Sequence, residues 1–537
     1  MKTTLLSLFL ICASTLFAQQ SNTDVKEVHI IFKTHLDIGY TDLQSKVEKT
    51  YLNEFIPKAL DVADELKRSG AKERYVWTTG SWLIYTFLQN APKPQVERLI
   101  KAIEAGDIVW NAMPYTLESE TMNRELFETI MSLSNQLDDR FGKTTTGAKM
   151  TDVPGHTRSI VPLLAKAGVK MLHIGVNPGS YVPKVPPICR WRNTDGSEIV
   201  LVYQSNYGDD MVFPDGKAAM SVVFTGDNHG PHTVQQVKDI YARIQKKYPN
   251  ATLKASSFTA VANLLDSQKE QFPVVTQEIG DTWVHGYQSA PVRMARFRAV
   301  QRLYAQWIKE GKINPSSEEA LRFALRISFI PEHTWGLDIK TFTKHWDAYT
   351  FDTFNAVKNK SEFKHAELSW LEMDENVDRA IEFLPVQLQE EAKKALETIG
   401  TANAQHITGM QRPSDVNEKG EVRLKLKSAQ MDMGKVTYQT YSADDFKRFN
   451  NTYNRDIKYW VTADFGKPGL ENTDVKSATL EARVKKIDSK IENGKRAIAS
   501  ELAFPSDSKV DARVLPEAVY SNTTIAPDGR SAEFSVT

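Results

Sequence analysis

The stretch VHIIFKTHLDIGY, residues 28–40, decides the fold class of this 537-residue chain. Residues 28–32 are apolar apart from one histidine, a pattern typical of a strand buried on both faces of a parallel sheet. The polar end that follows places His35 and Asp37 two positions apart, so in an extended segment their side chains point to the same side. An imidazole and a carboxylate that converge in this way suit Zn²⁺, although a surface or capping pair has the same spacing.

Apolar runs of similar length recur along the chain, separated by longer amphipathic stretches. Further strands are predicted at residues 74–77, 107–110, 148–151, 171–175, 199–203 and 251–255, and helices at 48–67, 82–88, 95–104 and 123–140. Strands that alternate with helices predict an α/β fold with a largely parallel sheet and helices outside it. The pattern fits an open sheet or a seven-stranded-type (β/α) barrel, and periodicity does not separate the two.

The pattern changes twice after residue 288. Helical periodicity dominates first, and we predict helices at residues 292–307, 317–327, 340–358 and 375–399. Short alternating runs follow at residues 421–426, 435–438 and 532–537. We therefore expect a signal peptide at 1–18, an α/β catalytic domain at 19–288, a helical bundle segment at 289–405 and a β-sandwich-like domain at 406–537, which the strand-like end suggests is incomplete.

The N-terminus has the layout of a cleaved secretory signal. Lys2 precedes the apolar run 5–12, and small residues lead to Ala18, after which we expect cleavage and a secreted or periplasmic protein. The sequence contains no apolar stretch of about 18 residues, so we expect no membrane insertion. Removing residues 1–18 leaves one cysteine, Cys189, which excludes an intramolecular disulfide. The 67 basic and 67 acidic residues cancel, which argues against nucleic acid as a partner.

Other polar segments follow predicted strands or interrupt predicted helices. α/β sheets build their sites at the carboxyl ends of strands, where residues 151–157 (TDVPGHT) and 225–230 (TGDNHG) lie. Residues 281–287 and 331–338 each place a histidine close to tryptophan and glycine. Taken alone, each segment is more often a helix cap, a loop or a satisfied histidine than a functional site.

The order of these motifs resembles glycoside hydrolase family 38, the zinc-dependent retaining α-mannosidases, over roughly residues 28–345. The motif at residues 35–40 is similar to the family's HxDxxW, and the segment at 149–157 resembles its DxFGxS block. Similar correspondences join residues 120–124 to GESLxRQ, 226–231 to GDGGGP, 285–291 to HRGTYTS and 329–333 to (F/H)HD.

This resemblance implies an exported, zinc-dependent retaining glycoside hydrolase that acts on α-linked sugars of a glycan or oligosaccharide. It implies a Zn²⁺ ion held by His35, Asp37, Asp152 and His333, with Asp152 also the nucleophile. His285 is the alternative to His333 as fourth ligand. Asp227 matches the family turn best as general acid, with Glu118, Glu120 and Glu332 as reserves.

The walls of the expected sugar pocket depart from the family pattern. Tyr40 stands where tryptophan is usual, Pro154 replaces an aromatic residue, and residues 110–118 lack an acidic pair. These departures predict a divergent branch whose sugar differs from mannose. The residues expected to contact the substrate are Tyr40, Trp82, His156, His285, Tyr287, Glu332 and Trp335.

Two other classes of function remain open at this stage. A polysaccharide deacetylase-like hydrolase also places a strand-end aspartate and histidines on zinc, but it needs only one general base. A carbohydrate-binding protein descended from an enzyme would keep the sugar pocket without the chemistry.

Overall fold

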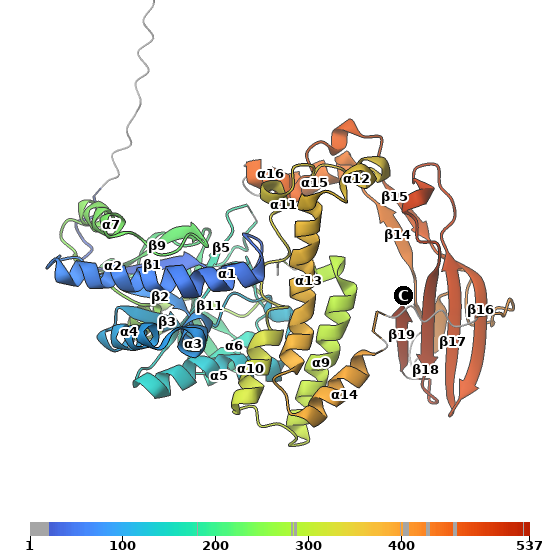
Figure 1. The fold of residues 1–537 in the computed structure, drawn as a ribbon, viewed down its shortest axis with the longest axis horizontal. Coiled ribbons are helices and arrows are strands. Elements are labelled where there is room, and N and C mark those ends of the chain that lie inside the picture. Colours follow the sequence, from blue (N-terminus) through green and yellow to red (C-terminus); the bar gives the residue numbers. More distant parts are fainter. Residues whose placement is uncertain are drawn as a thin grey trace, which may run out of the picture.

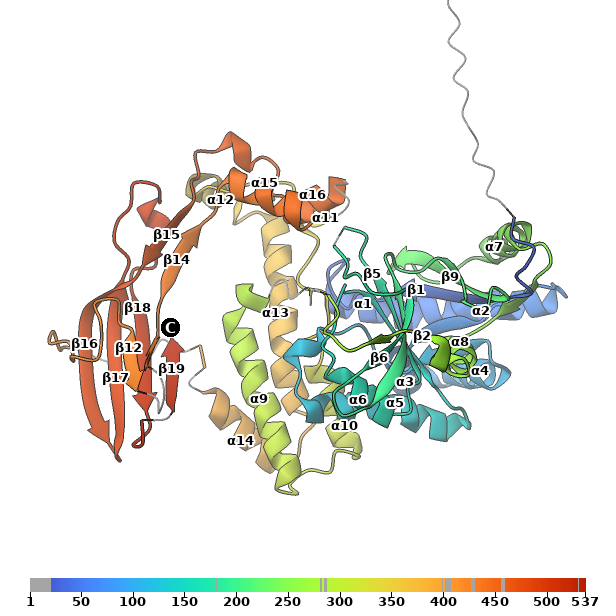
Figure 2. The same ribbon diagram turned by 180° about the vertical axis from the view of Figure 1, so that it is seen from behind.

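The computed structural model describes residues 21–179, 181–280, 283, 287–397, 399–400, 407–425, 430–454, 459–529 and 531–537. It has an α/β part, a central group of helices and antiparallel sheets at the far end (Figures 1 and 2). The predicted signal peptide, residues 1–18, lies outside the described residues. Among the described residues, no helix is both long enough and apolar enough to cross a membrane.

The first sheet of the α/β part is built around β1. Its strands are β1 (Glu27–His35), β2 (Trp77–Gly80), β3 (Ile108–Asn111), β8 (Asp210–Val212), β9 (Ala218–Asp227) and β10 (Thr252–Ala255). Their order is β3-β2-β1-β9-β8, and β10 also pairs with β1. β1 is parallel to β2, β9 and β10, which explains why residues 28–32 are apolar and buried.

The second sheet continues from the first around a shared interior. It contains β4 (Gly147–Asp152), β5 (Met171–Val176), β6 (Ile188–Arg192), β7 (Glu198–Gln204) and β11 (Val274–Val275) in the order β11-β6-β7-β5-β4. The backbone N–H of Ala112, just after β3, donates to the carbonyl of Gly147 at the start of β4 at 3.0 Å. The α/β class is confirmed. The sheets are mixed rather than wholly parallel, because β6–β7 and β8–β9 are joined by short connections that allow only antiparallel pairing.

The helices of the α/β part are α1 (Gln44–Thr50), α2 (Ile56–Arg68), α3 (Ser81–Asn90), α4 (Lys93–Ala105), α5 (Arg124–Phe141), α6 (Ile160–Lys166), α7 (Val234–Lys247) and α8 (Phe258–Asp266). A single π-helical turn, Tyr51–Phe55, joins α1 to α2. The central helices are α9 (Pro291–Lys309), α10 (Glu318–Ile327), α11 (Ile339–Phe342), α12 (Phe351–Val357), α13 (Ser361–Ile381) and α14 (Val386–Leu396). One hydrophobic core runs through both groups.

Two of the predicted helices are divided in the structure. The segment 340–358 forms α11 and α12, because a new helix starts at Thr350, whose side chain accepts from the Thr353 N–H. The segment 375–399 is interrupted before Pro385, since a proline removes a helical hydrogen bond and clashes with the preceding turn.

The C-terminal part consists of antiparallel pairs and one larger sheet. Its strands are β12 (Val422–Lys425), β13 (Gln430–Met433), β14 (Thr437–Thr440), β15 (Ala478–Glu481), β16 (Arg483–Glu492), β17 (Lys495–Ala503), β18 (Val519–Ile525) and β19 (Ala532–Val536). The last four form one antiparallel sheet in sequence order. Helices α15 (Ala443–Thr452) and α16 (Tyr459–Phe465) lie between β14 and β15 in sequence and extend over the central helices toward the α/β part (Figure 2).

Candidate metal centre and active site

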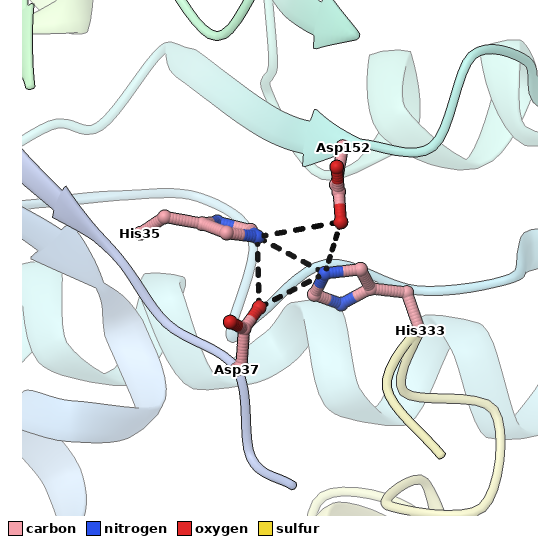
Figure 3. A group of neighbouring side chains, drawn as sticks. All are labelled: His35, Asp37, Asp152 and His333. Carbon is pink, nitrogen blue, oxygen red and sulfur yellow. Dashed lines mark hydrogen bonds and ion pairs between the residues drawn. The ribbon is translucent and has the colours of Figure 1, made fainter. Parts of the chain in front are cut away.

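Four buried side chains from three distant segments converge at the carboxyl ends of β1 and β4. His35 is the last residue of β1, Asp37 lies two residues beyond it, and Asp152 is the last residue of β4. His333 follows α10 and comes from the central helices. Figure 3 shows the four side chains pointing at one another, and one oxygen or nitrogen from each lies within 4.8 Å of the others.

The distances between these atoms fit a tetrahedral cation site. His35 Nε2 lies 3.0 Å from Asp37 Oδ1, 3.0 Å from His333 Nε2 and 4.0 Å from Asp152 Oδ2. His333 Nε2 lies 3.3 Å from Asp37 Oδ1 and 3.4 Å from Asp152 Oδ2. Ligands about 2.1 Å from a tetrahedral Zn²⁺ ion are separated by about 3.4 Å, close to these values. Two imidazole nitrogens and two carboxylate oxygens are also a donor set that Zn²⁺ accepts.

The backbone around the four side chains is held in conformations that most residues avoid. Tyr40, Asp152 and Asn228 have φ angles of +62°, +83° and +52°, and such angles in residues other than glycine are concentrated at functional sites. The Asn228 side chain shows how one of these segments is fixed. Its Nδ2 donates to the carbonyl of Asp37 at 2.8 Å, and its Oδ1 accepts from the Asp37 N–H at 3.1 Å. Asn228 therefore fastens the segment that carries Asp37.

The two oxygens of Asp152 have different surroundings. Oδ1 accepts hydrogen bonds from the hydroxyl of Tyr207 and, at 2.9 Å, from Asn177 Nδ2. Oδ2 faces His35 and His333. The carboxylate is thus fixed in one orientation by two donors that the sequence did not single out.

Burial and neighbouring charges shift several pKa values in and around the cluster. Burial and the charge of Asp37 raise the pKa of Asp227 to about 7. Burial acts to raise the pKa of Asp37, but the charge of His35 and a hydrogen bond from His333 outweigh it and lower this pKa. Burial lowers the pKa of Lys33 to about 8 despite the nearby charge of Asp227, and Lys33 Nζ donates to Thr151 Oγ1 at 3.3 Å in the interior below the cluster.

Asp227 lies next to the cluster, at the end of β9, where it pairs with His35. Its Oδ1 is buried and has no hydrogen-bond partner among the residues that the structure describes. The three reserve acids have different surroundings. Glu118 is fully buried, and burial raises the pKa of Glu120 to about 7. Glu332 contacts His333 directly.

The residues predicted to contact a sugar have different surroundings. Tyr40 follows Asp37, and its hydroxyl accepts from Lys340 Nζ at 3.0 Å. His156 is buried, with Nδ1 3.3 Å from Ser119 Oγ.

Tyr287 and Trp335 form an aromatic pair with ring centroids 4.6 Å apart. Trp82 packs in the hydrophobic core, where its ring lies 6.0 Å from Tyr115 and 5.2 Å from Phe329. His285 lies outside the described residues.

The C-terminal part reaches the same site through α16. Lys340 Nζ, which contacts Tyr40, also lies 2.8 Å from Asp338 Oδ1 and 2.9 Å from Asp464 Oδ1 at the end of α16. Asp464, more than 400 positions after Asp37 in the sequence, is thus linked through Lys340 to the segment that follows Asp37.

Comparison with known proteins identifies the family. The model for the glycosyl hydrolases family 38 N-terminal domain matches residues 26–309, just over half of the chain. A second model, described as a domain of unknown function (DUF5054), matches residues 288–426 and 418–524. No curated protein matches the chain.

Two solved structures from Enterococcus faecalis are similar to the chain. An α-mannosidase from strain V583 has a TM-score of 0.55 at 12% identity, and the match covers 95% of this chain and 73% of that one. A protein described as belonging to glycosyl hydrolase family 38 has a TM-score of 0.43 at 12% identity, with 95% and 60% covered. The first of these likenesses supports the fold, and the family model supports the lineage. The chain belongs to glycoside hydrolase family 38.

Proposed function

We propose that this glycoside hydrolase is an exported, zinc-dependent, retaining enzyme that cleaves α-linked sugars with Asp152 as its nucleophile. The observation that carries the proposal is the convergence of His35, Asp37, Asp152 and His333 within 4.8 Å. Asp152 Oδ2 faces the two histidines, while its Oδ1 accepts hydrogen bonds from Asn177 and Tyr207. A bound Zn²⁺ ion would keep the Asp152 carboxylate ionised and would hold sugar hydroxyls beside it.

Two carboxyl groups at one site, Asp152 and Asp227, support a retaining reaction. In the first step, the Asp152 carboxylate forms a bond to the anomeric carbon as the glycosidic C–O bond breaks, and Asp227 gives its proton to the leaving oxygen. In the second step, water attacks the same carbon and Asp227 takes a proton from it, so Asp152 is released. A buried carboxyl with a pKa of about 7 suits the acid in the first step and the base in the second.

Space beside Asp227 supports its role at the leaving group. Asp227 lines a cavity of about 350 Å³ together with Thr41, Tyr51, Phe55 and Phe342. Tyr51 is fully buried, whereas Phe55 and Phe342 are partly exposed, and aromatic rings of this kind pack against the apolar faces of sugar rings. The departing sugar would be accommodated in this cavity.

The choice of sugar follows from the similar structure and from the residues beside the cluster. The similar structure from E. faecalis V583 is described as an α-mannosidase, so an α-mannoside is the first substrate to test. Tyr40 and Pro154 stand where the family pattern has tryptophan and another aromatic residue, which favours a related α-linked sugar over mannose itself. Family membership favours glycoside hydrolysis over the deacetylase and non-catalytic alternatives.

Export is part of the proposal because residues 1–18 have the layout of a secretory signal. Expression of the full chain in a bacterial host should give a mature protein that begins at Gln19 and is released with the periplasmic fraction. A cytoplasmic product that retains Met1 would refute export without affecting the enzymatic proposal.

The enzymatic proposal is tested with α- and β-linked aryl glycosides, with and without a chelator. We expect cleavage of an α-linked substrate, loss of activity on chelation, recovery with Zn²⁺, and no activity in the His35→Ala, Asp37→Ala double variant. If metal-loaded protein cleaves none of the glycosides but releases acetate from acetylated sugars, the deacetylase alternative replaces the proposal. If activity is independent of metal, the zinc centre is wrong.

A further inference from the structure

The side chain of Glu332, next to His333, is held by hydrogen bonds to His333 and Thr334. Its side chain is 1% exposed, although it carries a carboxylate. Oε1 accepts from His333 Nδ1 at 2.7 Å. Oε2 accepts from the Thr334 N–H at 3.0 Å and from the Thr334 hydroxyl. Three donors from the protein therefore satisfy this carboxylate, as burial of a charged group demands.

The first of these bonds determines which nitrogen of His333 can face a cation. An ionised carboxylate only accepts hydrogen bonds, so the proton of a neutral His333 ring lies on Nδ1. The lone pair is then on Nε2, the atom that lies 3.3 Å from Asp37 Oδ1 and 3.4 Å from Asp152 Oδ2. Carboxylates that hold a histidine ligand in this way fix its orientation and increase its basicity.

The second oxygen connects His333 to the segment that carries the other ligands. Thr334 Oγ1, which donates to Glu332, accepts from the Gly39 N–H at 2.9 Å. Beyond this point the two segments run side by side, since the Tyr40 N–H donates to the Gly336 carbonyl at 2.8 Å and Tyr40 pairs with Leu337. A Cβ at Gly39 would lie 3.4 Å from the Gly336 oxygen, so the pairing is close. One carboxylate thus links the segments of His35 and His333, which are 298 positions apart.

We infer that Glu332 is the positioning residue of the metal centre: it selects the Nε2 lone pair of His333 and, through Thr334 and Gly39, sets the distance between His333 and Asp37. This role differs from the sugar contact and the reserve acid predicted from sequence. It rests on the proposed zinc centre but concerns metal binding, so it is measured without any substrate.

The test measures the affinity for Zn²⁺ by competition with a chromophoric chelator in the wild type and in four variants. Glu332→Gln keeps the size of the side chain, but its amide cannot accept from both His333 and Thr334. We expect it to bind Zn²⁺ about 10- to 100-fold more weakly, the loss typical of such partners. Thr334→Val removes the link to Gly39 and should lower the Zn²⁺ affinity by less than Glu332→Gln does. Thr334→Ser keeps the hydroxyl and should have the wild-type affinity. Glu372→Gln is the matched control, because Glu372 also joins distant segments, accepting from Ser45 Oγ at 2.6 Å, but lies outside the cluster.

The visible spectrum of the Co²⁺-loaded protein separates positioning of a ligand from general destabilisation. We expect the ligand-field bands to shift in Glu332→Gln and to stay unchanged in Glu372→Gln, even if both variants lose thermal stability. Wild-type metal affinity and an unshifted spectrum in Glu332→Gln, with only a higher KM, would overturn the inference in favour of a sugar contact. A wild-type protein that binds no Zn²⁺ would overturn the metal centre and this inference together.

Discussion

Replacing Asp227 with asparagine tests its role as the general acid. Asparagine has nearly the same shape but no proton to give to the leaving oxygen. At pH 6, a carboxyl with a pKa of about 7 is about 90% protonated, whereas a pKa of 3.8 would leave about 1% protonated. Before a cation binds, the surroundings of Asp227 therefore increase the fraction of the acid form about 100-fold at this pH.

The expected loss depends on the leaving group. For an alkyl glycoside, whose oxygen must be protonated to depart, we expect Asp227→Asn to lower kcat/KM by about 10²- to 10⁴-fold. For a dinitrophenyl glycoside, whose oxygen departs as a stable anion, the loss in kcat/KM should be below about 10-fold. In the wild type, kcat/KM should fall as the pH rises through the pKa of Asp227, because the proton is then lost. A bound cation favours the carboxylate, so this fall should begin at or below about pH 7.

The control is Asp215→Asn. Asp215 lies just before the start of β9, at the other end of the strand from Asp227, and accepts from the Lys217 N–H at 2.9 Å. This variant should leave both substrates and the pH profile unchanged. An equal loss for the two leaving groups in Asp227→Asn, with the alkaline fall retained, would show that another group is the acid. The same pair of substrates would then be applied to Glu118→Gln and Glu120→Gln.

Three further predictions concern the nucleophile, the metal and the contact with α16. Asp152→Asn should lower kcat by on the order of 10⁴-fold or more, and mass spectrometry should detect a fluorosugar adduct on Asp152 in the wild type; an adduct on another residue would reassign the nucleophile. With free Zn²⁺ at about 100 times its Kd, binding adds about 2.7 kcal/mol to the free energy of unfolding. Chelation should therefore lower the Tm measured by calorimetry, and added Zn²⁺ should restore it. If the Tm of His333→Ala responds to chelation as strongly as the wild type does, the ion is bound elsewhere. Lys340→Met leaves Asp338 and Asp464 without their shared cation, which should lower the free energy of unfolding in urea by about 1–3 kcal/mol. It also removes the donor to the Tyr40 hydroxyl, so KM should rise. An unchanged KM would argue against Tyr40 as part of the sugar pocket.

Local sequence predicts the parts of this site that depend on strand periodicity. The apolar run at residues 28–32 predicts β1, and the two-residue spacing predicts that His35 and Asp37 converge. Asn177 and Tyr207 lie in loops and reach Asp152 only through the packing of the second sheet, so no local pattern marks them. For Trp82, such patterns do not distinguish a sugar contact from core packing, and the predicted contact stays a prediction. An aromatic residue in an amphipathic helix fits a cleft and a core equally well, and here it lies in the core.

The ligands also differ in when they become available as the chain is made. His35, Asp37 and Asp152 are complete long before His333, which lies 298 positions after His35, and Asp464 follows later still. The segment that the family's N-terminal domain model matches, residues 26–309, ends before His333. A growing or truncated chain with only that segment would hold three of the four ligands and bind the ion weakly. The proposed metal centre would therefore be completed late, once His333 has been made, and a chain that stops before His333 should lack the activity of the full chain.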